Sequence, residues 1–81
     1  MNMVTIVGKY KGNYNYLEHT NLIIVEVDDM PVYIEVGNEM FDAIKTRAID
    51  TIVGVRGKLG MNCSIYQPQM VIKCDKLSFI A

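Results

Sequence analysis

PVYIEVGNEMFDAI, residues 31–44, changes its hydrophobic period halfway along. In the first half, Val32, Ile34 and Val36 alternate with more polar residues, which is the period-two pattern of a strand with one buried face. The proline at position 31 suits the start of such a strand, where its missing N–H costs little. This register places the three aliphatic side chains in the core and Tyr33 on the open face.

The second half of the stretch predicts a short helix of about ten residues. Met40, Phe41, Ile44 and Ala48 recur at intervals of three and four, which places them on one face of a helix. Asn38 is the predicted N-cap, because its side chain can accept a hydrogen bond from a free N–H of the first turn. A strand that leads directly into a helix is therefore the centre of the predicted fold.

The beginning of the chain predicts another strand, residues 3–10. Apolar and polar residues alternate along it, and Gly8 marks a bulge or a point of close backbone approach. The region of Gly12, Asn13 and Asn15 is rich in turn formers and is expected to end the strand.

Residues 21–27 predict a second strand, because they are rich in β-branched side chains and almost continuously apolar. Asp28 and Asp29 follow as a turn. Three or four residues join this strand to the one that starts at position 31. The two strands are therefore expected to form an antiparallel hairpin.

The second half of the chain predicts two more strands around a polar connection, residues 60–69. Residues 50–59 return to period two, with Gly57 in phase with the apolar positions. Residues 70–80 form the last strand. Its apolar phase changes near Asp75 and Lys76, which predicts an irregularity there.

The predicted order is three strands, one helix and two strands. This is the order of the OB-fold, a five-stranded Greek-key barrel that binds oligonucleotides and oligosaccharides. The chain has 81 residues, about half of them apolar, which suits one domain. The sequence thus predicts an all-β protein: a single OB-fold domain, residues 1–81, with one short helix between strands 3 and 4.

Charge is unevenly distributed along the chain. The net charge is −1 overall, but it is +1 over residues 1–20, −6 over residues 21–42 and +4 over residues 43–81. An acidic middle between basic flanks predicts a polarised surface with a local basic track.

Several classes of function are disfavoured by what the sequence lacks. His19, Cys63 and Cys74 do not have the spacing of a zinc site, and the two cysteines are expected to be reduced thiols. No phosphate-binding glycine motif occurs, and a single histidine gives no basis for a catalytic triad. No apolar run is long enough to span a bilayer, and no secretory signal is present. We expect a cytoplasmic protein that is not an enzyme and needs no metal or cofactor.

Three stretches resemble bacterial single-stranded DNA-binding proteins. Residues 1–9, MNMVTIVGK, are similar to the start of these proteins, which typically read M-N-x-V-x-L-V-G-R/K. Residues 50–59, DTIVGVRGKL, resemble their fourth strand, where V-x-V-x-G-x-L follows a helix, and residues 70–80 resemble their last strand. The resemblance covers nearly the whole chain. It implies a non-catalytic protein that binds single-stranded DNA in replication, recombination or repair.

The chain departs from that family in two respects. Its connection between the last two strands is short, residues 60–69, where the family has a long basic and aromatic hairpin. It also contains no tryptophan, so the stacking tryptophans of the family have no counterparts. The chain is closer in form to the primosomal replication protein N type, or to small homologues from phages and mobile elements.

Sequence-tolerant binding of single strands needs cations for the phosphates and flat rings on which bases stack. Both kinds of side chain occur at the end of strand one, on the open face of strand three, on the outward phase of strand four, on strand five, and in the two loops that flank an OB-fold's binding face. The candidate nucleic-acid-binding residues are Lys9, Tyr10, Lys11, Tyr14, Tyr16, Tyr33, Arg56, Lys58, Tyr66 and Lys73. Tyr10 has an alternative role, which is to cap the end of the barrel.

Two functions remain open from the sequence. The first is binding of single-stranded nucleic acid, most simply DNA, with RNA as an alternative. The second is a protein-interaction OB module or assembly subunit with little nucleic-acid affinity, which the acidic residues of strands 2 and 3 favour. A small barrel with this many apolar residues is also expected to form a homodimer or homotetramer, with replication proteins as further partners.

Overall fold

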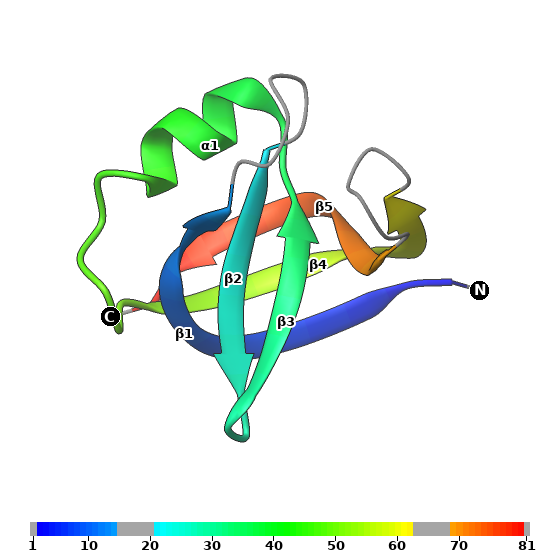
Figure 1. Ribbon diagram of the computed structural model, residues 1–81, viewed down its shortest axis with the longest axis horizontal. Coiled ribbons are helices and arrows are strands. Elements are labelled where there is room, and N and C mark those ends of the chain that lie inside the picture. Colours follow the sequence, from blue (N-terminus) through cyan, green and yellow to red (C-terminus); the bar gives the residue numbers. More distant parts are fainter. Residues whose placement is uncertain (1, 15–20, 63–68, 81) are drawn as a thin grey trace.

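Five strands and one helix make up the part of the chain that the computed structural model describes, residues 2–14, 21–62 and 69–80 (Figure 1). The elements are β1 (Val4–Tyr14), β2 (Leu22–Val27), β3 (Met30–Glu35), α1 (Asn38–Ile44), β4 (Ile52–Asn62) and β5 (Gln69–Phe79). The strands close into a barrel in the order β1-β2-β3-β5-β4. This is the OB-fold, and the prediction of a five-stranded barrel with a helix between strands 3 and 4 is confirmed.

Strand β1 closes the barrel because it pairs with two different strands. Its first part is antiparallel to β4, from Val4 opposite Gly57 to Lys9 opposite Ile52. Its second part is antiparallel to β2, and the register shifts at Lys11. In Figure 1 β1 correspondingly curves around the lower left of the barrel.

The expectation that Gly12 and Asn13 end β1 is wrong. The strand continues to Tyr14, because Gly12 adopts φ of +125° beside the bulge at Lys11. Only glycine reaches this region readily, so a residue that signals a break in the sequence instead allows the strand to bend and continue.

The β2–β3 hairpin is tighter than predicted. Val27 pairs with Met30, so the turn contains only Asp28 and Asp29, whose φ angles are 50° and 64°. Positive φ at both central positions is the conformation of a type I′ turn, whose twist matches that of the flanking strands. The predicted antiparallel pairing is confirmed.

Helix α1 lies across one end of the barrel, opposite the β2–β3 turn (Figure 1). It is shorter than predicted, and its N-cap is Gly37 rather than Asn38. The Asn38 side chain instead accepts a hydrogen bond of 2.5 Å from Asn21 Nδ2. Ile44 is fully buried and packs on the barrel core, whereas Ala48 lies beyond the helix and is exposed.

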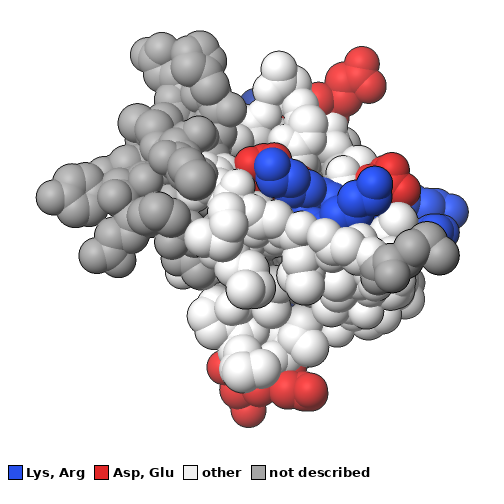
Figure 2. Space-filling model, turned by 90° about the vertical axis from the view of Figure 1, so that its right-hand side faces the viewer, with Lys and Arg blue, Asp and Glu red and all other residues white. Residues whose placement is uncertain are grey.

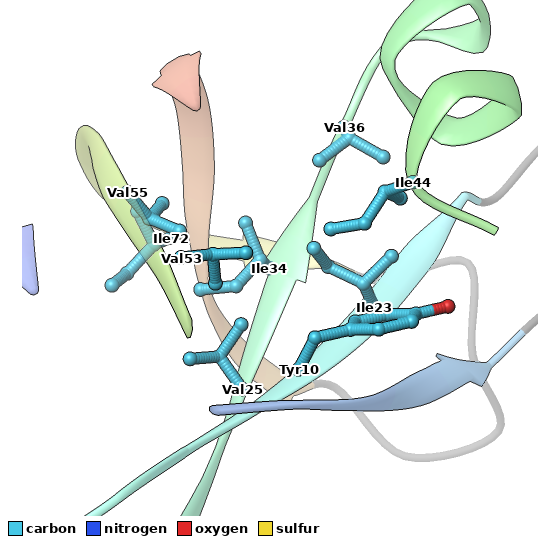
Figure 3. Close-up of a cluster of buried hydrophobic side chains, with 9 residues drawn as sticks. All are labelled: Tyr10, Ile23, Val25, Ile34, Val36, Ile44, Val53, Val55 and Ile72. Atoms are coloured by element: carbon cyan, nitrogen blue, oxygen red, sulfur yellow. The ribbon is translucent and has the colours of Figure 1, made fainter. Parts of the chain in front are cut away.

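The core confirms the predicted register of β3. Ile34 is fully buried and Val36 is 5 % exposed, while Tyr33 lies on the opposite phase and is half-buried. Figure 3 shows these two aliphatic side chains within a cluster to which all five strands and the helix contribute. The cluster contains Tyr10, Ile23, Val25, Ile34, Val36, Ile44, Val53, Val55 and Ile72.

Two local predictions about β4 and β5 are also confirmed. The register between these strands shifts so that Arg56 faces Lys76 and Gly57 faces Cys74, which leaves Asp75 as the bulged residue. Gly57 lies in phase with the buried positions, and a Cβ atom there would come within 2.2 Å of the Lys73 carbonyl oxygen. The bulge therefore depends on the absence of a side chain at position 57.

Candidate nucleic-acid interface

Four cations form a compact group on the outer face of β4 and β5. In the β4–β5 register Arg56 lies opposite Lys76, and Lys58 lies opposite Lys73. All four side chains are exposed. We call these residues the cation ladder. No member has an acidic side chain within ion-pair distance among the residues that the structure describes.

A basic band is visible on one face of the molecule (Figure 2). Figure 2 shows Lys and Arg side chains in a band across the middle of one face. The lower end of the same face is acidic, and Figure 1 places the β2–β3 turn there. The polarised surface predicted from the charge pattern is therefore present in part: the lower end of this face is acidic, whereas the basic band has acidic side chains beside it.

Next to the ladder, an apolar slot separates β3 from the β4–β5 hairpin. Strands β3 and β5 pair in parallel only at Ile34–Ile72 and Glu35–Lys73. Beyond these pairs lies a cavity of about 220 Å³. It is lined by Pro31, Val32, Tyr33, Leu59, Met70, Val71 and Ile72.

Tyr33 is the ring that borders this slot. It lies opposite Ile24 in the β2–β3 register and is half-buried, so part of its surface is accessible. Leu59 and Met70 on the other side of the slot are exposed large apolar residues. The slot thus offers a ring and apolar walls, the surface on which a base can stack.

Acidic side chains occupy the β2–β3 hairpin. Asp28 and Asp29 are exposed at its turn, and Glu26 precedes them on β2. Lys9 of β1 lies opposite Glu26 and lines a hollow with all three acids. The charge of Lys9 is therefore surrounded by negative groups, unlike the charges of the ladder.

Glu35 is the acid nearest the ladder in the strand register. Its Oε1 accepts a hydrogen bond of 2.8 Å from Nδ2 of Asn62, which is 4 % exposed. The carboxylate thus satisfies a buried amide at the end of the barrel, and its position reflects a structural role.

Lys11 also has a structural partner. Its Nζ donates a hydrogen bond of 2.5 Å to Oδ1 of Asp50, which raises the pKa of Lys11 and lowers the pKa of Asp50. Two backbone hydrogen bonds of 2.8 Å, from Tyr10 N to Thr51 O and from Asp50 N to Tyr10 O, join the same segments. Lys11 thus ties β1 to the segment that enters β4.

The prediction that Tyr10 binds nucleic acid is contradicted by its burial. Its side chain is only 2 % exposed, so its ring cannot serve as a stacking surface for a base. Figure 3 shows the ring packed against the core cluster, with its hydroxyl pointing away from it. The alternative role, closing the end of the barrel, agrees with this burial.

The other predicted tyrosines lie partly or wholly outside the described structure. Tyr14 ends β1, but its side chain is outside the description, and Tyr16 and Tyr66 lie outside the described residues altogether. The same holds for His19 and Cys63, so the prediction of reduced thiols remains a prediction for Cys63. The roles proposed for these tyrosines remain predictions as well.

Lys76 is a member of the ladder that the sequence pattern did not reveal. Alternation alone does not place it on the face of Lys73, since the two residues are an odd number of positions apart. The bulge at Asp75 restores the phase. The change of apolar phase near Asp75 already indicated the bulge. Because a bulge shifts the phase of every later residue in the strand, it also predicts that Lys76 lies on the face of Lys73.

Two further classes of site have no counterpart in the described ranges. Within residues 2–14, 21–62 and 69–80, no group of three His, Cys, Asp or Glu side chains is arranged to hold a metal ion. In the same part of the chain, no helix is long and apolar enough to cross a membrane.

Comparison with known proteins gives the fold class. No family model and no curated protein matches the sequence. Solved structures do match, and they include the dimeric N-terminal domain of PriB from Thermoanaerobacter tencongensis, at 18 % identity and a TM-score of 0.66, covering 99 % of this chain and 97 % of that domain.

Two other matches widen the comparison. The second single-stranded DNA-binding protein of Mycobacterium smegmatis, SSBb, has 14 % identity and a TM-score of 0.73, covering 99 % of this chain and 87 % of that one. Asparaginyl-tRNA synthetase from Pyrococcus horikoshii has 18 % identity and a TM-score of 0.74, covering 96 % of this chain. This chain spans only 19 % of the synthetase.

These likenesses confirm the sequence resemblance at the level of the fold. The chain has the OB-fold that single-stranded DNA-binding proteins and PriB share. Because the identities are low, these likenesses show the fold alone. The function is inferred from the side chains of this chain.

Proposed function

We propose that this chain is a non-catalytic OB module that binds single-stranded nucleic acid, DNA in the first place, in replication, recombination or repair. The observation that carries the proposal is an apolar, tyrosine-bordered slot together with exposed cations on the neighbouring strands β4 and β5. Lys73 lies opposite Glu35 in the β3–β5 register, and Glu35 is two residues from Tyr33, so Lys73 and Tyr33 lie on the same face of the sheet. Rings for bases and cations for phosphates are the two requirements for sequence-tolerant binding.

The first experiment measures fluorescence anisotropy of a labelled oligo-dT of about 16 nucleotides. Binding is expected at about 50 mM NaCl and should weaken markedly at about 200 mM, because cations that neutralise phosphates release counterions. An oligo-U of equal length distinguishes DNA from RNA. Absence of binding at low salt and tens of micromolar protein would refute the proposal.

The second experiment isolates stacking at Tyr33. Tyr33→Ala should weaken binding by about tenfold or more, since one base–aromatic stack contributes about 1–3 kcal/mol. Tyr33→Phe keeps the ring and is the matched control. Equal losses of affinity in both variants would show that the ring does not stack on a base.

Self-association is part of the same proposal. Among the described strands, none pairs with the second edge of residues 4–7 of β1, because β2 joins β1 only from Lys9 onward. An unpaired strand edge is a template for pairing with another chain. Val7 is 55 % exposed on this segment. We propose a homodimer or homotetramer, and sedimentation equilibrium at micromolar concentration that shows only the 9.2 kDa monomer would exclude it.

A specific observation favours the second candidate, a protein-interaction module. Between α1 and β5 lies a groove of about 810 Å³ whose lining includes Met40, Leu77 and Phe79. Arg47 stacks on the Phe79 ring at 3.9 Å. If wild-type protein does not bind oligonucleotides, this groove becomes the surface to test with replication proteins.

A further inference from the structure

The cation ladder places like charges directly across from each other on neighbouring strands. Arg56 faces Lys76, and Lys58 faces Lys73, with only one position between the two members on β4. Like charges in directly opposite positions destabilise a sheet. The free protein therefore carries two repulsive pairs on one face.

The surroundings of the ladder relieve this repulsion only in part. Asp75 lies between the two pairs on β5, and it is exposed at the bulge. Glu35 lies beside Lys73, but its carboxylate is hydrogen-bonded to Asn62. The only ion pairs in the described ranges are Lys11–Asp50 and Lys45–Asp42, away from the ladder.

The geometry of the ladder suits a linear polyanion. Arg56 and Lys58 project from the same side of β4, two residues apart, which corresponds to about 7 Å along a strand. This spacing is comparable with the separation of neighbouring phosphates in an extended nucleic-acid strand. The two pairs can thus meet successive phosphates.

The opposite hairpin is a poor path for phosphates. In OB-folds the outer face of strands 2 and 3 commonly carries the ligand. Here that hairpin carries Glu26, Asp28 and Asp29, and Lys9 is the cation that lies among them. A phosphate backbone is repelled at that end of the barrel.

We propose that the phosphate backbone of the bound strand runs along β4 and β5 over the cation ladder, with Lys76 as a contact, and that the ladder's repulsion makes the free protein less stable. This inference rests on the proposed function. It implies that these four cations raise the affinity for the ligand and lower the stability of the free protein, because the charges that attract phosphates repel one another in the unliganded sheet.

The decisive variant is Lys58→Glu. It converts the Lys58–Lys73 pair into an opposite-charge pair, so the thermal midpoint of the free protein should rise. Affinity for oligo-dT at about 50 mM NaCl should fall more than tenfold, and the slope of log K against log [salt] should become shallower by about 0.7 for each phosphate that the variant no longer neutralises. A merely structural lysine would not raise stability and lower affinity together.

Lys45→Glu is the matched control. It changes the net charge by the same amount on an exposed cation of the α1 end, which is paired with Asp42 at 2.8 Å. Its thermal midpoint should not rise, since it replaces an attraction by a repulsion, and its affinity should stay within about threefold of wild type. Lys76→Ser gives a milder test of the residue added by the bulge, with a shallower salt slope expected.

The outcomes separate the two proposals. If wild type binds oligo-dT while Lys58→Glu and Lys45→Glu are equally affected, the path over the ladder is wrong and the proposed function stands. An Lys58→Glu protein that is folded but no more stable than wild type would refute the opposition between binding and stability. If wild type does not bind, the proposed function fails, and the path fails with it.

Discussion

The two antiparallel hairpins of this barrel, β2–β3 and β4–β5, differ in almost every respect. The β2–β3 hairpin has strands of six residues, a two-residue turn and an acidic tip. The β4–β5 hairpin has strands of eleven residues, a bulge at Asp75 and the cation ladder. A net charge of −1 therefore conceals two surfaces of opposite sign.

This difference shows what net charge can and cannot say about a binding protein. A phosphate strand responds to the local field within about a Debye length, roughly 10 Å at 0.1 M salt. The acidic hairpin therefore does not cancel the ladder. It restricts the side from which a polyanion approaches.

The largest expected effect tests whether the β4–β5 bulge is required. Gly57→Ala should destabilise the protein by about 3 kcal/mol or more, because the new Cβ would lie 2.2 Å from the Lys73 carbonyl oxygen, and backbone has to move. Urea unfolding measures the loss. Gly37→Ala is the control: a Cβ there meets nothing within 4 Å and φ is −71°, so only the poorer N-capping by alanine counts, and a loss of about 1 kcal/mol or less is expected. Similar losses of stability in both would contradict the crowding argument.

An intermediate effect is expected at the acidic turn. The double substitution Asp28→Asn with Asp29→Gly supplies the residues that a type I′ turn prefers, and should stabilise the hairpin by about 1 kcal/mol. It also removes two negative charges. Thermal unfolding measures the first effect, and oligo-dT anisotropy at low and high salt measures the second.

If the acidic turn repels the ligand, the double variant should bind more tightly at low salt and equally at high salt. Glu39→Gln with Asp42→Asn removes the same charge from α1 and serves as the control. A gain of affinity in the helix variant but not in the turn variant would place the ligand at the other end of the barrel.

The smallest effect is expected where β1 meets the segment before β4. Lys11 lowers the pKa of Asp50, so the ionised carboxylate adds stability at pH values above its ordinary pKa, and this is lost as the pH falls through the lowered value. The raised pKa of Lys11 adds stability below its ordinary pKa, and this is lost in strong base. The contribution is therefore present at neutral pH.

Asp50→Asn tests this ion pair. Asparagine tolerates the φ of 75° at this position, so the charge is removed without new backbone strain. The thermal midpoint should be slightly lower than that of wild type near pH 7, and the two proteins should converge as the pH falls through the lowered pKa of Asp50. A difference that stays constant as the pH is lowered from neutral until Asp50 is protonated would assign the effect to something other than charge.

Much of the fold was predictable because the hydrophobic period of each segment and the turn-forming residues at its ends indicated the same element. The change of period at residues 31–44 placed the helix, and the change of phase near Asp75 located the bulge. The errors arose at residues whose type is compatible with two different local structures. Gly12 signals a break but supports a bulge, and Asn38 suits an N-cap but bonds to Asn21 instead.

The site was less predictable, because it depends on register. The cross-strand pairing places Lys58 opposite Lys73 and Arg56 opposite Lys76. No local sequence pattern predicts which residues of two strands lie opposite each other. Burial likewise decides that Tyr10 belongs to the core, although its neighbours Lys9 and Lys11 made it resemble a surface residue. Tyr33 was correctly placed outside the core because its neighbours fixed the phase.

The double pairing of β1 has a consequence for how the chain folds. The β2–β3 hairpin forms from neighbouring residues, but Val4 finds Gly57 roughly fifty positions away. Such distant contacts carry a large loop-closure cost and slow the folding of barrels to milliseconds or seconds. During synthesis β1 is made first and cannot pair with β4 until β4 has been made, so its apolar residues stay exposed until then. Closure of the barrel is therefore expected to be the late, rate-limiting event.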